Sequence, residues 1–447
     1  MPLLVHAVVR LLRVLLIVLV TASKDQVIQS LPNVQRETGS THIPFTPRVV
    51  VYDKHNHKSN GQAILKELSM LRTSDFYSLT SNLNETLDIH LAGLHLPPYT
   101  GSNFPKELVL HLQRSAHLLS SRFVLRTFAP NGSEVVESIS NKQLAQARCS
   151  YTGYVIGIAL SSAAVNLCSG LEGSVTMAGI VFNIERTLIG DKFEHHLIQA
   201  DNNNEVYDGK YGNDEQAPTN SLPWHRGKRG MRPPAGSTTK TRYLEMYVVA
   251  DKKCATRNGT ENAVKRIIRI INEANSLYSQ LGVYISIVGI ELWTDRNKLP
   301  TPITEGANPS IILDEFVQYR KVHINSKFFN DNAQLFIGIR MERSIVGKAN
   351  VNTMCSLMFN AGISSDRSVD HRLTAMTMVH ELGHNFGLVH DNESCSVNCK
   401  IIPGRPANEP QHCIMFGAVA SKYVYIILAL ASTHFIITAC FCKGLIM

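Results

Sequence analysis

Three histidines and one glutamate lie within residues 380–390, which read His-Glu-Leu-Gly-His-Asn-Phe-Gly-Leu-Val-His. Residues four apart on a helix lie on the same face, so a helix allows His380 and His384 to bind one metal ion from one side. Gly387 allows the chain to leave that helix through a backbone conformation that a Cβ disfavours. The resulting turn brings His390 back as a third ligand. The spacing therefore predicts a three-histidine metal centre.

The chemistry expected of this centre is that of catalytic zinc. Three imidazoles leave the fourth position of a tetrahedral Zn²⁺ ion to water, whereas a structural zinc site has four protein ligands. Zinc lowers the pKa of bound water to about 7, which makes hydroxide available at neutral pH. Glu381 follows the first ligand and is the expected general base, which takes the water proton and passes it to a leaving amine. The alternative, in which ordinary hydrogen bonds satisfy the histidines, does not require all of these residues at these spacings.

Residues 1–23 have the pattern of a signal peptide. Arg10 and Arg13 precede an apolar run at residues 14–20, and small residues follow it. The run is shorter than the roughly 20 residues that a bilayer span needs, which favours cleavage over anchoring and over a buried N-terminal helix. We therefore expect the chain to enter the secretory pathway and to act extracellularly or at the cell surface.

Further sequence features agree with export. The chain has nine cysteines; in an exported protein most of them should form disulfides, and the odd number leaves at least one over. Cys149 and Cys168 are the only cysteines before residue 229, and a bond between them is their simplest use. Candidate N-glycosylation sites, a pattern that also arises by chance, begin at Asn84, Asn131, Asn258 and Asn392.

Residues 24–229 are rich in short β-like runs separated by turns. The polar stretch at residues 201–219 leads into an Arg-Gly-Lys-Arg run that ends at Arg229. Proprotein convertases of the secretory pathway cut such runs in exposed linkers, although a basic tetrapeptide is also compatible with a solvated surface patch. The position of the run at a change in composition favours processing. We therefore predict a prodomain that ends with a cut after Arg229.

Residues 230–422 show a different pattern, in which strands alternate with helices. Such alternation predicts a largely parallel sheet with helices on its faces. The net charge of +8 is not accompanied by any groove-reading motif, so nucleic-acid binding is not expected. The predicted strands are residues 243–250, 284–293 and 333–339, and the predicted helices are residues 261–281, 311–322 and 371–386.

The histidine segment resembles the extended zinc signature of the metzincins, and Asp391 after the third histidine is similar to the reprolysin or ADAM branch. Residues 243–251 resemble the opening strand of those catalytic domains. Residues 331–335 resemble the strand before their active-site helix. A Cys-Ile-Met run that ends at Met415 resembles the Met-turn, whose methionine forms a hydrophobic floor beneath the zinc ligands.

The resemblance spans most of the chain, because the stretches that begin at Cys149 and Cys168 resemble parts of the family's prodomain. It implies an α/β (α+β) metzincin catalytic domain, with a twisted mixed sheet and an active-site helix, preceded by a β-rich prodomain. The implied activity is that of a zinc metalloendopeptidase that hydrolyses peptide bonds of extracellular or cell-surface proteins. A substrate strand would lie antiparallel to the edge strand of the sheet. Specificity would depend on loops such as residues 358–368.

The resemblance also implies two secondary features. Cys399 and Cys413 match a local disulfide pair of the family, and Glu245 and Asp331 match two side-chain ligands of a calcium site. The C-terminal calcium ligands fall in a segment that differs from the family pattern, which argues against full occupancy by Ca²⁺.

The sequence departs from the family pattern at three points. Family prodomains often carry a cysteine that caps the zinc, and none lies between Cys168 and Arg229. Latency would therefore come from steric cover by the prodomain or from a cysteine used differently. The downstream disintegrin, cysteine-rich, EGF-like and thrombospondin modules have no counterpart in the sequence. After the Met-turn the catalytic domain is C-terminally incomplete, without the usual partners of Cys355 and Cys395.

The hydrophobic tail at residues 423–447 has two interpretations. Its apolar stretch reaches the short end of the length that spans a bilayer, which would give membrane association. Alternatively it is a C-terminal sequence without an evolved role; a GPI signal is less expected because a polar spacer is scarcely present. The incomplete catalytic domain leaves a second hypothesis for function, a truncated, non-catalytic ADAM-like product that acts as a binding or decoy protein.

Overall fold

The computed structural model places much of the chain from residue 42 onward. The chain divides into two compact units, Met1–Thr41 and His42–Met447, and all described residues belong to the second. The predicted signal peptide and hydrophobic tail therefore lie outside the described residues. Within the described part, no helix has both the length and the apolar character needed to cross a membrane. The described residues are 42–51, 64–67, 86–94, 107–158, 161–168, 170–177, 180–189, 192–199, 209–212, 215–216, 241–354, 356–390, 414–415 and 418–419.

The first sheet is antiparallel and has nine strands, in the order β11-β10-β9-β8-β7-β4-β3-β1-β2. Because β11 also pairs with β1, the sheet closes on itself, and β2 pairs with β1 outside this ring. Alternate residues along the strands are buried and pack into one apolar core that includes Leu110, Val165 and Phe182. The strands are β1 (His42–Val51), β2 (Ile64–Glu67), β3 (Thr86–Ala92), β4 (Leu108–Arg114), β7 (Ser150–Val155), β8 (Ser162–Asn166), β9 (Glu172–Met177), β10 (Ile180–Ile189) and β11 (Lys192–Gln199).

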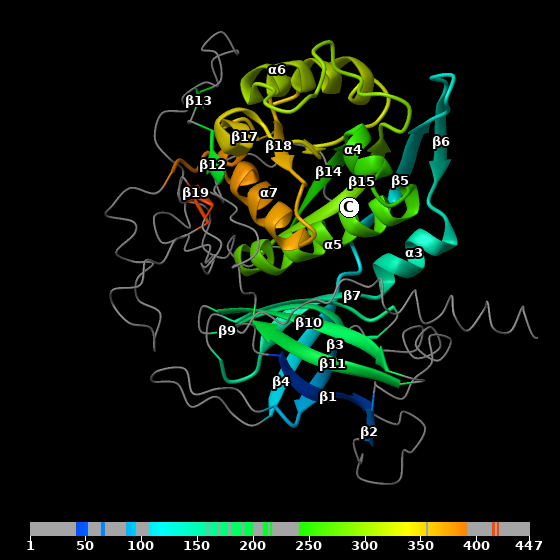
Figure 1. Ribbon diagram of the computed structural model, residues 1–447, viewed down its shortest axis with the longest axis vertical. Coiled ribbons are helices and arrows are strands. Elements are labelled where there is room, and N and C mark those ends of the chain that lie inside the picture. The colour runs from blue at the N-terminus through cyan, green and yellow to red at the C-terminus, as the bar shows by residue number, and fades with distance from the viewer. Residues whose placement is uncertain are drawn as a thin grey trace, which may run out of the picture. The chain divides into compact units, whose positions relative to one another are not determined.

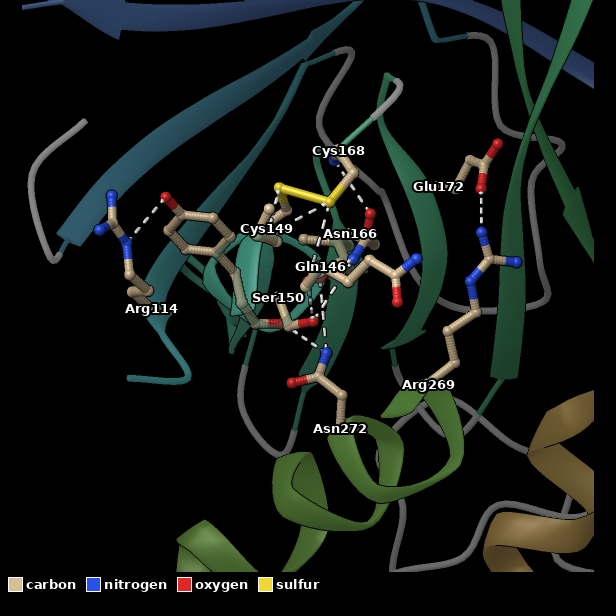
Figure 2. Close-up of a disulfide and its surroundings, with 12 residues drawn as sticks. Arg114, Gln146, Cys149, Ser150, Asn166, Cys168, Glu172, Arg269 and Asn272 are labelled. Atoms are coloured by element: carbon tan, nitrogen blue, oxygen red, sulfur yellow. Dashed lines mark hydrogen bonds and ion pairs between the residues drawn. A yellow bond between two sulfur atoms is a disulfide. The ribbon is translucent and has the colours of Figure 1, made fainter. Parts of the chain in front are cut away.

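A disulfide joins Cys149 to Cys168 as predicted, with their Cα atoms 5.1 Å apart (Figure 2). Cys149 is the C-cap of helix α3 (Asn141–Arg148). The helix begins with a capping box in which Ser140 and Gln143 exchange side-chain-to-backbone hydrogen bonds. The disulfide therefore ties the end of α3 to the chain just after β8.

The second sheet is mixed and has ten strands, with the order β19-β12-β17-β18-β16-β14-β15-β5-β6 and with β13 paired to β17 beside this path. Strands β5, β15, β14, β16 and β18 run parallel, and β17 runs antiparallel to β18. The strands are β5 (Leu119–Phe128), β6 (Glu134–Ser138), β12 (Gly209–Tyr211), β13 (Glu215–Gln216), β14 (Arg242–Ala250), β15 (Val283–Leu292), β16 (Asn332–Ile337), β17 (Ile345–Val351), β18 (Ala361–Ser365) and β19 (Ala418–Val419).

The second sheet combines strands from both sides of Arg229. Strands β5, β6, β12 and β13 precede this residue, whereas the other strands follow it. In Figure 1, β5 and β6, both drawn in cyan, continue the sheet beyond the green strand β15. The segment expected to form a separate prodomain therefore supplies strands on both sides of the C-terminal half of the sheet.

Helices cover both faces of this sheet. Successive residues of a strand point to opposite faces, and Met246 and Val248 of β14 pack in one core with residues of α5 and α7. Tyr247 and Val249 pack in another core with residues of α6. These helices lie close to the ranges that hydrophobic periodicity predicts. The helices of this half are α4 (Lys252–Thr256), α5 (Thr260–Tyr278), α6 (Pro309–Tyr319) and α7 (His371–Asn385).

One local expectation was wrong. Residues 358–368 were expected to be a loop, but residues 361–365 form β18, whose five residues are all buried. β18 pairs with β16 on one side and with β17 on the other. A short buried strand shows no alternation of polar and apolar residues, so its sequence is not distinguished from a loop by periodicity.

Candidate metal centre

Helix α7 carries three of the four residues expected to perform chemistry. The helix begins at the N-cap Asp370, whose side chain accepts a hydrogen bond from the Arg372 N–H. The side chains of His380, Glu381 and His384 are buried, with 0%, 1% and 2% of each residue exposed. Burial of polar groups is costly without partners, so the surroundings of these side chains define what they can do.

Backbone carbonyls orient two of the imidazoles. His380 Nδ1 lies 2.6 Å from Ile414 O, and His384 Nδ1 lies 2.8 Å from Leu388 O. A carbonyl oxygen only accepts hydrogen bonds, so each Nδ1 donates its proton and each Nε2 keeps a lone pair. Burial, followed by the nearby His384, holds the pKa of His380 well below its usual value. His380 is therefore neutral, and the carbonyl partners at Nδ1 leave Nε2 of both histidines as the nitrogen that can bind a metal.

His390 completes the cluster from the turn that follows α7. One nitrogen from each of His380, His384 and His390 lies within 4.8 Å of the others, and the Nε2 atoms of His380 and His390 are 3.1 Å apart. Gly387 has φ of 96°, a conformation that favours glycine, and its N–H donates to His384 O. Three converging histidine nitrogens fit the requirements of one Zn²⁺ ion with a fourth position for water.

Glu381 lies against strand β17. A Cβ placed on Gly347 would overlap Glu381 Oε1 and would lie 2.7 Å from Thr377 Cγ2. The absence of a side chain at residue 347 therefore makes room for the carboxylate between α7 and β17. This role of Gly347 was not evident from the sequence, because the close approach involves two segments far apart in the chain.

Met415 packs against the middle of α7. A Cβ on Gly383 would lie 2.5 Å from Met415 Sδ, so the glycine allows this close approach. Met415 is 5% exposed, and the preceding residue supplies the carbonyl that binds His380 Nδ1. The segment at residues 414–415 thus contacts the centre through both a side chain and a backbone carbonyl.

The other predicted residues fall into two groups. Asn131 and Asn258 are exposed, as a glycan acceptor requires, and Cys254 is a buried free thiol. Eight further residues lie outside the described part of the chain: Asn84, Arg229, Cys355, Asp391, Asn392, Cys395, Cys399 and Cys413.

The two candidate calcium ligands have protein partners. The Glu245 carboxylate forms an ion pair with the Arg122 guanidinium of strand β5. Asp331 accepts a hydrogen bond of 2.9 Å from the Glu245 backbone N–H. The Arg122 guanidinium, from the N-terminal half, therefore lies beside the Glu245 carboxylate, which matches a calcium ligand of the family.

Sequence reasoning missed one aromatic residue at the centre. The Tyr211 ring of β12 stacks on the His380 ring, with centroids 3.5 Å apart and planes inclined by 7°. Tyr211 is 4% exposed. The sequence analysis expected the prodomain to cover the centre, but no local motif identifies Tyr211 as the residue that does so.

Two parts of the chain match models of known protein families. Residues 242–428 match the model described as "Reprolysin (M12B) family zinc metalloprotease", and residues 99–156 match "Reprolysin family propeptide". The chain is 30% identical over 302 residues to the "Zinc metalloproteinase-disintegrin-like atrase-B" of Naja atra, which covers 64% of this chain and 48% of that protein. The chain thus spans about half the length of this relative. A solved structure titled "Structure of a chaperone-substrate complex" gives a TM-score of 0.29 at 20% identity, over 34% of this chain and 25% of that chain, and supports no argument.

These matches imply a metzincin α/β catalytic fold preceded by a propeptide. Residues 242–428 are thus similar to reprolysin-family zinc metalloprotease domains, and residues 99–156 to the propeptides of that family.

Proposed function

We propose that this chain is a zinc-dependent metalloendopeptidase made as a proenzyme. One observation carries the proposal: His380 and His384 each donate Nδ1–H to a backbone carbonyl while one nitrogen of each converges with a nitrogen of His390. Histidines that serve only as packing residues have no need of this common orientation. Glu381, on the same helix, supplies the acid–base group that hydrolysis requires.

In the proposed mechanism, His380, His384 and His390 would hold one Zn²⁺ ion, which would supply a lowered pKa for water and polarisation of the substrate carbonyl. Glu381 accepts a proton from the attacking water and then delivers it to the leaving nitrogen. Because the carboxylate gives up the proton that it took, it returns to its starting state after each turnover. Its burial against Gly347 holds it in place and excludes bulk water, which strengthens its interactions with developing charge.

Protein or peptide chains are the proposed substrates. A substrate strand would pair with the outer edge of β17, the strand that adjoins Glu381. The chain's residues do not identify the cleaved sequence. The proposed surroundings are the cell surface or the extracellular space, where the tail at residues 423–447 would allow membrane association.

The proposed order of events begins with removal of residues 1–23 in the secretory pathway. Residues 24–229 act as the prodomain, and a proprotein convertase cuts after Arg229. Residues 230–422 contain the catalytic centre. The exposure of Asn131 and Asn258 supports glycosylation on both sides of the cut.

The test is hydrolysis of a mixed peptide library by the secreted, convertase-processed protein, run beside Glu381→Ala. We expect cleavage that both a chelator and the substitution abolish, with zinc still bound to the variant. Cleavage that persists in Glu381→Ala would exclude this glutamate as the general base. A processed, zinc-loaded protein that cleaves nothing would exclude the protease and point to the binding or decoy role instead.

A further inference from the structure

Residues 209–212 and 215–216 lie along β17, and Tyr211 reaches the metal centre. Tyr211 pairs with Gly347, and the Gly212 N–H donates a 3.0 Å hydrogen bond to Gly347 O. Further along, β13 pairs with residues 350–351 in the same parallel direction. Strand β19 pairs with the other side of β12. The segment is therefore held as a strand in the second sheet.

This pairing uses the edge of β17 that a substrate needs. A strand has two hydrogen-bonding edges, and one edge of β17 pairs with β18. The remaining edge pairs with β12 and β13. A substrate that adds to β17 must therefore displace β12 and β13.

The Tyr211 side chain adds a contact at the centre itself. Its ring covers the face of the His380 imidazole, and it packs in an apolar cluster with Val346 of β17. Tyr211 also pairs with Gly347, the residue that makes room for Glu381. One residue of the N-terminal half thus lies beside both a proposed metal ligand and the support of the proposed general base.

We propose that the edge of β17 and the face of His380 form a binding site for an extended peptide with an aromatic side chain, and that β12 and β13 occupy it in the proenzyme. This proposal rests on the proposed protease function, because it concerns access to the same centre. Tyr211 serves as a latch that takes the place of a zinc-capping cysteine. The segment runs parallel to β17, opposite to the direction expected of a substrate, so it blocks the edge without imitating a substrate.

The latch predicts how a small chelating probe binds the uncut protein. The experiment uses the full proprotein with Arg229→Ala, which prevents the processing cut, and a fluorescent peptide hydroxamate as the probe. We expect Tyr211→Ala to tighten probe binding by about tenfold, because an aromatic stack and its burial contribute on the order of 1 kcal/mol or more. Tyr211→Phe keeps the ring and should behave like the parent protein. A chelator should also extract zinc faster from Tyr211→Ala than from the parent protein. Its rate with Tyr211→Phe should equal that with the parent.

Two controls keep the outcome clear. Tyr154→Ala removes another tyrosine of the N-terminal half, one that is 49% exposed, and should leave probe binding unchanged. Gly212→Pro removes the hydrogen bond to Gly347 while retaining the Tyr211 ring, so it tests the same segment if Tyr211→Ala does not fold. We expect it also to tighten probe binding.

The zinc content separates the two proposals. If none of the folded proteins binds zinc, the proposed protease function fails. If zinc is bound and the convertase-processed protein binds the probe, but Tyr211→Ala and Gly212→Pro bind it no better than the parent, the latch is overturned while the protease proposal stands.

Discussion

Arg126 and Glu291 form a buried ion pair between the two halves of the chain. Arg126 precedes the predicted processing site at Arg229 in the sequence, and Glu291 follows it. Arg126 Nη1 lies 2.8 Å from Glu291 Oε2, and the two side chains are 4% and 0% exposed. Glu291 also accepts hydrogen bonds from Tyr319 and Trp293. Around this pair, β5 and β15 run side by side in the second sheet. The N-terminal half is therefore part of the core of the C-terminal half.

Replacing Arg126 with Ala should destabilise the proprotein by about 3–5 kcal/mol, because it leaves the Glu291 carboxylate buried without its cation. Urea unfolding measures this loss. Lys142→Ala is the matched control. The side chains of Lys142 and its partner Glu261 are 62% and 50% exposed, and an exposed ion pair contributes little to the free energy of unfolding. Equal midpoints for Arg126→Ala and the parent protein would contradict the importance of this ion pair.

Cleavage after Arg229 should leave the two fragments associated, since β5 and Arg126 remain in place after the cut. The convertase-treated protein should elute from a size-exclusion column as one species that contains both fragments. Arg126→Ala should weaken this association. Separate elution of the parent fragments at micromolar concentration would show that the sheet does not hold them together.

Stability should depend on pH through Glu273, a residue of α5 whose carboxylate accepts hydrogen bonds of 2.7 and 2.8 Å from Ser174 of β9. Burial raises the pKa of Glu273 from 4.5 to about 7, although the Ser174 hydrogen bond opposes the rise. Between these values the folded protein keeps a proton that the unfolded chain has lost, so stability falls as pH rises through this window. The loss at pH 8 approaches about 3 kcal/mol.

Glu273→Gln provides the comparison for this pH effect, because it carries no charge at any pH. The free energy of unfolding of the parent protein should fall relative to that of the variant between pH 5 and pH 8. The comparison is needed because burial lowers the pKa of His371 to about 4. That shift makes stability rise with pH between about 4 and 6.5. A difference between parent and variant that stays constant with pH would rule out the Glu273 effect.

Gly347→Ala should lower the turnover of the processed enzyme by about 10²-fold, because the added Cβ displaces the Glu381 carboxylate. Peptide hydrolysis measures the effect, with kcat expected to fall more than KM rises. Zinc content should be unchanged, since the three atoms nearest the added methyl group belong to Glu381 and Thr377 and not to a histidine. Full turnover in a zinc-loaded Gly347→Ala protein would show that the carboxylate tolerates the shift.

Removing the disulfide with Cys149→Ser and Cys168→Ser together should destabilise the N-terminal half by about 3 kcal/mol, the value expected for a loop of this length. The cysteines are 19 residues apart. The disulfide lies near α5, whose Asn272 side chain donates to the backbone of Tyr151 and whose Arg269 pairs with Glu172 (Figure 2). Proteolysis of the reduced and oxidised protein provides a second measurement, and equal rates would argue against a structural role.

The sequence predicted α5, α6 and α7 and the strands β14, β15 and β16 close to their observed ranges, whereas α4, β17 and β18 were not predicted. The convergence of His380 and His384 follows from helix geometry, and Gly387 indicated the turn toward His390. The contacts of Gly347 and Tyr211 were not predictable. Each depends on which strand edges meet in space, and strand pairing between distant segments leaves no periodic signal in either segment.

Pairing between distant strands also explains why the sequence did not show that residues on both sides of Arg229 share one sheet. Composition changes near Arg229, and it was natural to expect separate folding units on its two sides. Arg126 does not reveal in its local sequence that it enters the core beside Glu291. A charged residue in a strand usually indicates a solvated face, and only the partner from the other half makes burial possible.

The N-terminal strands flank the C-terminal half at both ends of the second sheet, with β5 beside β15 and with β12 and β13 beside β17. Unpaired strand edges invite association with other chains. During synthesis the N-terminal half leaves the ribosome first, so β5 and β12 are available when the later strands emerge. A chain made without these segments would present two open strand edges to neighbouring chains, and aggregation would compete with folding.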